Sequence, residues 1–197
     1  MAILIAKPAG IPCDKDKIDG AIIYQKPVSL SYVYAKEGKL FHEKYKRFSE
    51  CNWNKLKTLK KYPALIYINE DSKIKKHKKS SWCPLFLNRN LAVVAAGEVG
   101  STRLDLSYLK FFAEKNLNPM LKKVPNLLFL ESGKWMMERF IGFEAAMIVI
   151  NSDGDIRIMN QKYGETVNKM WVFDSIVHSL QYHHSTSSSY GGHYLGC

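Results

Sequence analysis

The chain has 197 residues, of which 46% are hydrophobic and 12% aromatic, so it can bury a substantial core and is not disordered as a whole. No apolar run reaches the roughly 18 residues of a transmembrane helix, and the apolar start before Lys7 is too short for the core of a signal peptide. Lysine and arginine number 29 against 18 acidic residues, a net charge of +11, which predicts an anionic partner such as nucleic acid, acidic lipid or a wall polymer, the alternative being a merely lysine-rich soluble surface.

The first third of the sequence predicts strands and one short helix. Residues 21–24 and 29–34 are rich in β-branched and aromatic side chains, so we expect two strands. Leucine and tryptophan spaced by three predict a helix over 50–61 with Ser49 as its N-cap. The apolar run 64–68 predicts a further strand.

A run of five lysines and one histidine occupies residues 73–79. We expect a solvated loop there, because charge runs are usually exposed, and this loop supplies the candidate anion-binding residues Lys75, Lys76, Lys78 and Lys79. Lysines and aromatic residues earlier in the chain could also track phosphates and stack bases. These are Lys55, Lys57, Lys60, Lys61, Trp53, Tyr62 and Tyr67.

The long apolar run Leu85–Ala96 follows directly on Cys83 and Pro84. Proline is favoured at the first position of a helix and glycine just after the last, so Pro84 and Gly97 predict a buried helix between them. Cys83 would then lie at the helix N-terminus, where the dipole and free N–H groups favour a thiolate.

The rest of the chain predicts a second helix and then a sheet. The helix begins at Ser101 and ends before Asn118-Pro119, and 126–130 reads as a strand. Two apolar runs flank Asp153-Gly154, which is a strong hairpin signal. Residues 171–182 alternate as a further strand, and the Ser- and Gly-rich stretch that follows predicts a flexible tail.

This order of elements resembles the papain-like cysteine amidases and peptidases of the NlpC/P60 and CHAP type. The segment Ser81–Asn88 is similar to their Trp-Cys-x-x-Phe-x-Asn element, and residues 142–158 are similar to the strand pair that carries their histidine. The resemblance covers residues 80–184 and implies a papain-like core and hydrolysis of an amide, typically in peptidoglycan. The family's histidine should follow Gly142, where this chain has Phe143.

On this resemblance Cys83 would be the nucleophile and His178 the base that replaces the missing histidine. Glu144 or Asp174 would orient the base, and His42 is an alternative base in a circularly permuted arrangement. Backbone N–H groups at the helix start would form part of an oxyanion hole.

The same residues also allow non-catalytic interpretations. Cys83 could be a buried, inert thiol, and the widely spaced cysteines Cys13, Cys51, Cys83 and Cys197 predict reduced thiols, with one bridge left open. Three histidines and a cysteine near the C-terminus lie in a Ser/Gly-rich stretch without a compact zinc spacing. We therefore predict no metal and no cofactor.

Together these patterns predict an α+β fold, an antiparallel sheet packed against a few helices with a papain-like core. We expect a strand-rich lobe over 1–70, within or beside a core over 71–184, and a tail over 185–197. The function favoured is a cysteine amidase or endopeptidase that degrades the anionic cell wall. It would be made without a cleaved signal peptide and reach a target periplasm or wall by lysis or injection. The alternative is a non-catalytic basic protein that binds nucleic acid or a protein partner.

Overall fold

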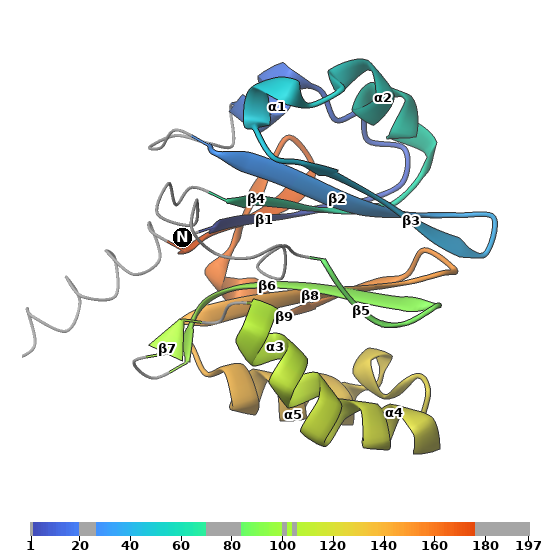
Figure 1. The fold of residues 1–197 in the computed structure, drawn as a ribbon, viewed down its shortest axis with the longest axis vertical. Coiled ribbons are helices and arrows are strands. Elements are labelled where there is room, and N and C mark those ends of the chain that lie inside the picture. The colour runs from blue at the N-terminus through green and yellow to red at the C-terminus, as the bar shows by residue number, and fades with distance from the viewer. Residues whose placement is uncertain (1, 20–26, 70–83, 100–101, 104–105, 176–197) are drawn as a thin grey trace, which may run out of the picture.

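The computed structural model describes residues 2–19, 27–69, 84–99, 102–103 and 106–175. These residues form two antiparallel sheets that lie face to face, with helices on the outer face of each (Figure 1). The order of layers is therefore helices, sheet, sheet, helices. The predicted α+β class is confirmed.

The first sheet has six strands in the order β10-β11-β1-β4-β2-β3. Its strands are β1 (Ala2–Lys7), β2 (Ser29–Lys36), β3 (Lys39–Tyr45), β4 (Ala64–Asn69), β10 (Glu165–Val167) and β11 (Met170–Asp174). Strand β1 pairs with β4 on one side and with β11 on the other, with Ile3 opposite Asp174. Strands from the expected N-terminal lobe and from the far end of the chain thus share one sheet.

The second sheet runs in the order β5-β6-β8-β9, with the short β7 paired to β6. Its strands are β5 (Leu85–Asn88), β6 (Leu91–Val99), β7 (Thr102–Arg103), β8 (Ala145–Asn151) and β9 (Ile156–Met159). The β8–β9 pair is the hairpin that the Asp-Gly signal predicted.

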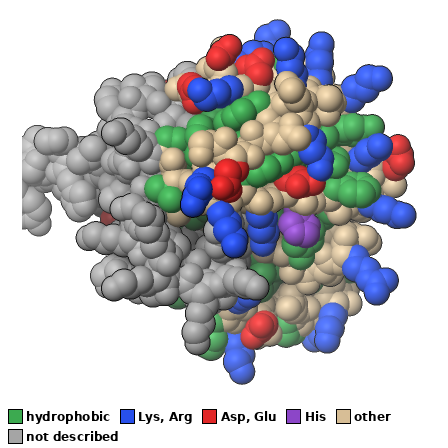
Figure 2. Space-filling model, turned by 45° about the horizontal axis from the view of Figure 1, so that its top comes forward, with side chains coloured by type: hydrophobic (Ala, Val, Ile, Leu, Met, Phe, Trp, Pro, Cys, Tyr) green, Lys and Arg blue, Asp and Glu red, His purple; other side chains and the backbone are tan. Residues whose placement is uncertain are grey.

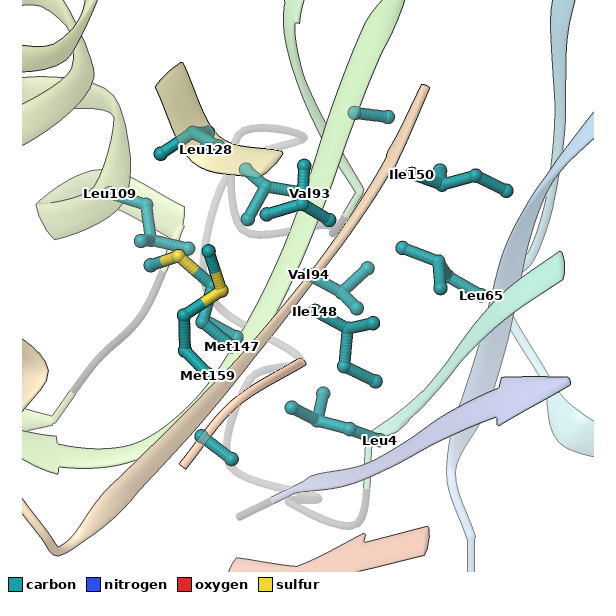
Figure 3. Close-up of a cluster of buried hydrophobic side chains, with 14 of the residues drawn as sticks. Leu4, Leu65, Val93, Val94, Leu109, Leu128, Met147, Ile148, Ile150 and Met159 are labelled. Atoms are coloured by element: carbon teal, nitrogen blue, oxygen red, sulfur yellow. The ribbon is translucent and has the colours of Figure 1, made fainter. Parts of the chain in front are cut away.

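The core between the sheets is built from alternate residues of their strands (Figure 3). Leu4 and Leu65 face the second sheet, and Val94, Ile148 and Ile150 face the first. The other face of each strand is also covered, so β1 and most of β8 are buried on both sides. Burial on both faces favours uninterrupted apolar sequence over alternation.

Two groups of helices close the outer faces. One group, α1 (Lys15–Asp19) and α2 (Trp53–Thr58) with the 3-10 turn η2 (Leu59–Lys61), covers the first sheet. The other group is α3 (Leu106–Phe112), the π-helical segment 113–117, α4 (Asn118–Lys123), the 3-10 turn η6 (Leu127–Phe129) and α5 (Glu131–Ile141). It packs on the second sheet (Figure 1). No described helix is long and apolar enough to cross a membrane.

The predicted helix over Leu85–Ala96 is wrong, because this run forms β5 and β6. The part of the run that forms β6, residues 91–96, is apolar throughout because β6 is buried between the first sheet and α3–α5, and a doubly buried strand shows no alternation. The break lies at Asn88-Arg89-Asn90, where the Asn88 side chain accepts a hydrogen bond from the Asn90 N–H at 2.8 Å, a turn chemistry typical of asparagine. Without this helix the papain-like core is left unconfirmed.

Other elements agree in part. The strands expected over 29–34 and 64–68 are confirmed as β2 and β4. The expected helix over 50–61 is α2 followed by η2, and its cap is Asn52, whose side chain accepts from the Lys55 N–H, instead of Ser49. The strand expected over 126–130 is wrong, since η6 lies there, and Asn118-Pro119 opens α4 where a helix end was expected. Residues 21–24 and the end of the strand expected over 171–182 lie outside the described residues.

Candidate functional site

The expected catalytic residues are not brought together by the part of the chain that the structure describes. Cys83 and His178 lie outside it. The segment after Pro84 is a strand, so the helix dipole that would have favoured a Cys83 thiolate is absent. Glu144 precedes β8 in the second sheet, whereas Asp174 ends β11 in the first. Hydrolysis at Cys83 thus stays a prediction, but the helix that was expected to favour its thiolate is not formed.

The two described thiols lack the character of nucleophiles. Cys13 and Cys51 are buried against the inner side of α1 and α2 and are not bridged. Burial raises the pKa of each to about 12, so the reactive thiolate is scarce at neutral pH. They pack as small apolar side chains.

Of the remaining expected residues, His42 is described by the structure and the four lysines are not. His42 is an exposed residue of β3 whose ring lies edge-on to Phe86 of β5, 5.1 Å between centroids, and desolvation lowers its pKa. The four lysines predicted to bind anions, Lys75, Lys76, Lys78 and Lys79, lie outside the described residues, as does the histidine-rich C-terminus. Within the described ranges no group of three histidine, cysteine or acidic side chains could hold a metal.

A basic surface extends over β3, α2 and the turns beside them. Residues 36–61 contain nine lysines and arginines and only three glutamates. The cations are Lys36, Lys39, Lys44, Lys46, Arg47, Lys55, Lys57, Lys60 and Lys61. Figure 2, which brings the α1–α2 side forward, shows Lys and Arg side chains spread across this part of the molecule. We call these nine residues the basic surface.

Contacts between α2, η2 and the strands connect several of these residues. Lys55 of α2 forms an ion pair with Glu43 of β3. Lys36 at the end of β2 lies over the Tyr62 ring, 5.6 Å from its centroid. The other two glutamates are also paired, Glu37 with Lys36 at 3.5 Å and Glu50 with Arg47 at 3.6 Å. Each carboxylate is thus engaged locally, and the surface keeps a large positive excess.

A buried lysine supports the backbone of the basic surface from below. Lys7 ends β1 and its side chain is fully buried. Its Nζ donates to the carbonyl oxygens of Tyr62 at 2.6 Å, Pro8 at 3.0 Å and Lys60 at 3.5 Å. Desolvation lowers the pKa of Lys7 to about 8. This lysine therefore fixes the turn η2, on which Lys60 and Lys61 stand.

A second surface, the α5 groove, lies on the opposite helical layer. It is a cavity of about 930 Å³ between α5 and the turn after β9. Two large rings at its rim are open to solvent, Trp135 at 61% and Phe143 at 46%. The groove is lined by Lys134, Trp135, Glu138, Arg139, Gly142, Phe143, Asn160, Gln161, Lys162 and Tyr163.

The cations of the α5 groove lie on its rings. The Arg139 guanidinium is 4.8 Å from the centroid of Trp135, and the Lys162 ammonium is 4.9 Å from that of Tyr163. Among the described residues that line the groove, Glu138 is the one carboxylate. It accepts a hydrogen bond from the Asn160 N–H at 2.8 Å and lies 3.9 Å from the Lys134 ammonium.

Asn160 holds the floor of the groove together. It is buried, has a left-handed backbone (φ 59°) and directly follows β9. Its side-chain amide donates to the carbonyl oxygens of Gly142, at the end of α5, and of Ala145, at the start of β8, the latter at 2.8 Å. This side chain therefore sets the position of Phe143, which lies between those two carbonyls in sequence.

This groove was not predicted from the sequence, because no helix was expected over residues 131–141. The available signal was the spacing of Met137 and Ile141, four residues apart, before Gly142, which fits a helix with a glycine stop. Phe143 was considered only as the residue in place of a histidine. Searches against protein-family models, curated proteins and solved structures find no match for this chain.

Proposed function

We propose that this protein is a non-catalytic nucleic-acid-binding protein that contacts the phosphate backbone through the basic surface. The observation that carries this proposal is the threefold excess of cations over carboxylates in residues 36–61, on one connected part of the fold. Lysines that neutralise phosphates release condensed counterions, and this release drives sequence-independent binding.

The arrangement suits backbone contact better than reading of bases. The aromatic rings near the basic surface pack on one another: Tyr34 stacks on Phe41 at 5.4 Å and lies 6.2 Å from Tyr62. Helix α2 has only six residues and lies on the first sheet, so it is too short and too closely packed to enter a major groove as a recognition helix. We therefore expect affinity with little sequence preference.

The test compares three exposed lysines of the basic surface with three on the opposite layer. Lys57, Lys60 and Lys61 would be changed together to glutamine, and the matched control would change Lys115, Lys122 and Lys123 to glutamine. Binding of a labelled oligonucleotide of about 20 nucleotides would be followed by anisotropy at about 50 to 200 mM KCl. The first variant is expected to bind at least about tenfold more weakly and with a shallower salt slope, and the control within about twofold of the parent.

Three results would overturn the proposal. The first is no binding by the parent protein at the lowest salt. The second is an equal loss in both variants, which would mean that only net charge matters. The third is equally tight binding of polyglutamate, which would reveal a general polyanion binder without selectivity for phosphate.

A further inference from the structure

The α5 groove exposes more apolar area than the basic surface, where Phe41 at 41% is the one large apolar side chain that the described residues 36–61 leave exposed. Trp135 and Phe143 together offer two large rings to solvent at the edge of one cavity. Exposed aromatic clusters rimmed by polar residues mark interaction sites in soluble proteins. Tryptophan, tyrosine and arginine, all present here, are also the residue types that dominate the energetics of protein interfaces.

The cations in the groove indicate the charge of the partner. The groove is lined by three cations, Arg139, Lys162 and Lys134, and by one carboxylate, Glu138, which already accepts the Asn160 N–H. The groove therefore has a small positive excess. It complements an anionic ligand carrying a few charges.

The position of those cations distinguishes a peptide from a nucleic acid. Arg139 and Lys162 lie on the faces of Trp135 and Tyr163, so a base stacking on those faces would have to displace them. A carboxylate can instead pair with the cation while an apolar side chain contacts the ring edges and Phe143. An acidic chain with apolar anchors satisfies both kinds of group without rearrangement.

We propose that the α5 groove binds an acidic peptide segment of a partner protein, with aromatic or aliphatic side chains of the peptide packing against Trp135 and Phe143. Carboxylates of the peptide pair with Arg139 and Lys162. This site is separate from the basic surface, and the proposal does not depend on nucleic-acid binding.

The experiment selects ligands from a random-peptide display library on the immobilised full-length protein. The comparison protein is the double variant Trp135→Ala/Phe143→Ala, and the matched control is Phe111→Ala, which removes a ring of equal exposure (62%) on α3 outside the groove. We expect the parent and the control to enrich the same peptides, rich in Asp and Glu and with aromatic or leucine anchors. A synthetic copy of one such peptide should bind the double variant at least about tenfold more weakly.

The charge requirement is tested with Arg139→Gln/Lys162→Gln, which should weaken the same peptide about threefold to tenfold. The proposal is overturned if no peptide distinguishes the parent from the double variant, or if the enriched peptides are neutral or basic. It is also overturned if a labelled oligonucleotide loses affinity for Trp135→Ala/Phe143→Ala, since nucleic acid would then occupy the groove.

Discussion

The basic surface and the α5 groove both combine cations with aromatic rings, but in opposite proportions. The basic surface has nine cations, and aromatic rings beside them pack on one another. In the groove the rings are exposed and three cations lie beside or upon them. The first arrangement offers much charge and one exposed ring, and the second offers two exposed rings and little charge.

This difference teaches that composition alone does not separate binding modes. Both regions are basic and aromatic in sequence, and only the packing reveals which groups are available to a partner. Binding through charge is weakened by salt, whereas burial of apolar area is not. Salt concentration and a substitution in the floor of the groove should therefore affect the two surfaces differently.

The largest expected difference is in salt dependence. If the basic surface neutralises about four phosphates, raising KCl from about 50 to about 200 mM should weaken nucleic-acid binding about a hundredfold. The same change should weaken peptide binding in the groove by less than about fivefold, because its cations are few and its rings supply apolar contact. Parallel titrations of both ligands measure this, and equal slopes would contradict the division into two modes.

The second prediction concerns the floor of the groove. Asn160→Ala removes two side-chain hydrogen bonds, one buried and one partly buried, and places alanine in a left-handed backbone, so it should lower the free energy of unfolding by about 2–4 kcal/mol. Urea denaturation measures the loss, and Asn116→Ala, at an exposed asparagine, is the control. In the folded variant nucleic-acid affinity should stay within about twofold while peptide affinity falls by at least about fivefold. A matching loss of nucleic-acid binding would show that the two surfaces are coupled.

The smallest expected effect is the pH dependence due to Lys7 beneath the basic surface. Its pKa is about 8 in the folded protein and 10.5 without burial. Between these values the unfolded chain binds a proton that the folded chain lacks, so the Lys7 contribution to stability rises with pH. The free energy of unfolding of the parent, minus that of Lys7→Met, should therefore rise by about 1–2 kcal/mol between pH about 7.5 and about 9.5.

The parent-minus-variant difference also removes the titration of two buried thiols, whose effect on stability has the opposite sign. Burial raises the pKa values of Cys13 and Cys51, so their contribution to stability falls as pH rises above the unfolded thiol value, in parent and variant alike. A parent-minus-variant difference that is flat with pH would refute the lowered pKa of Lys7. The lysine at position 7 would then be charged throughout this range in the folded state.

An element could be predicted from the sequence where a turn signal or an alternating pattern marks it, and could not where burial on both faces removes that pattern. The β8–β9 hairpin was found because Asp153-Gly154 interrupts two apolar runs, and β2 because its pattern alternates. The run over β5 and β6 was misread because burial on both faces removes the alternation that identifies a strand. Turn chemistry at Asn88 and Asn90 was the overlooked signal.

Of the two candidate sites, the basic surface was predicted in part from the sequence and the α5 groove was not. The lysines of α2 were identified from sequence, because charge density needs no knowledge of packing. The α5 groove could not be found in this way, since Phe143 and Tyr163 are separated by twenty residues in sequence and meet only through Asn160 and the β8–β9 hairpin. The supporting role of Lys7 could not be predicted either, because two of its three carbonyl partners, those of Lys60 and Tyr62, lie more than fifty positions away in sequence.

The pairing of β1 with β11 has a consequence for biosynthesis. A ribosome must translate beyond residue 170 before β1 receives its second neighbour, so that flank of a highly apolar strand stays without its native partner while more than 160 further residues emerge. Such an unfinished edge is a template for wrong associations. The nascent chain is thus exposed to aggregation through this edge until β11 has been made, because β11 joins β1 to β10 in the first sheet.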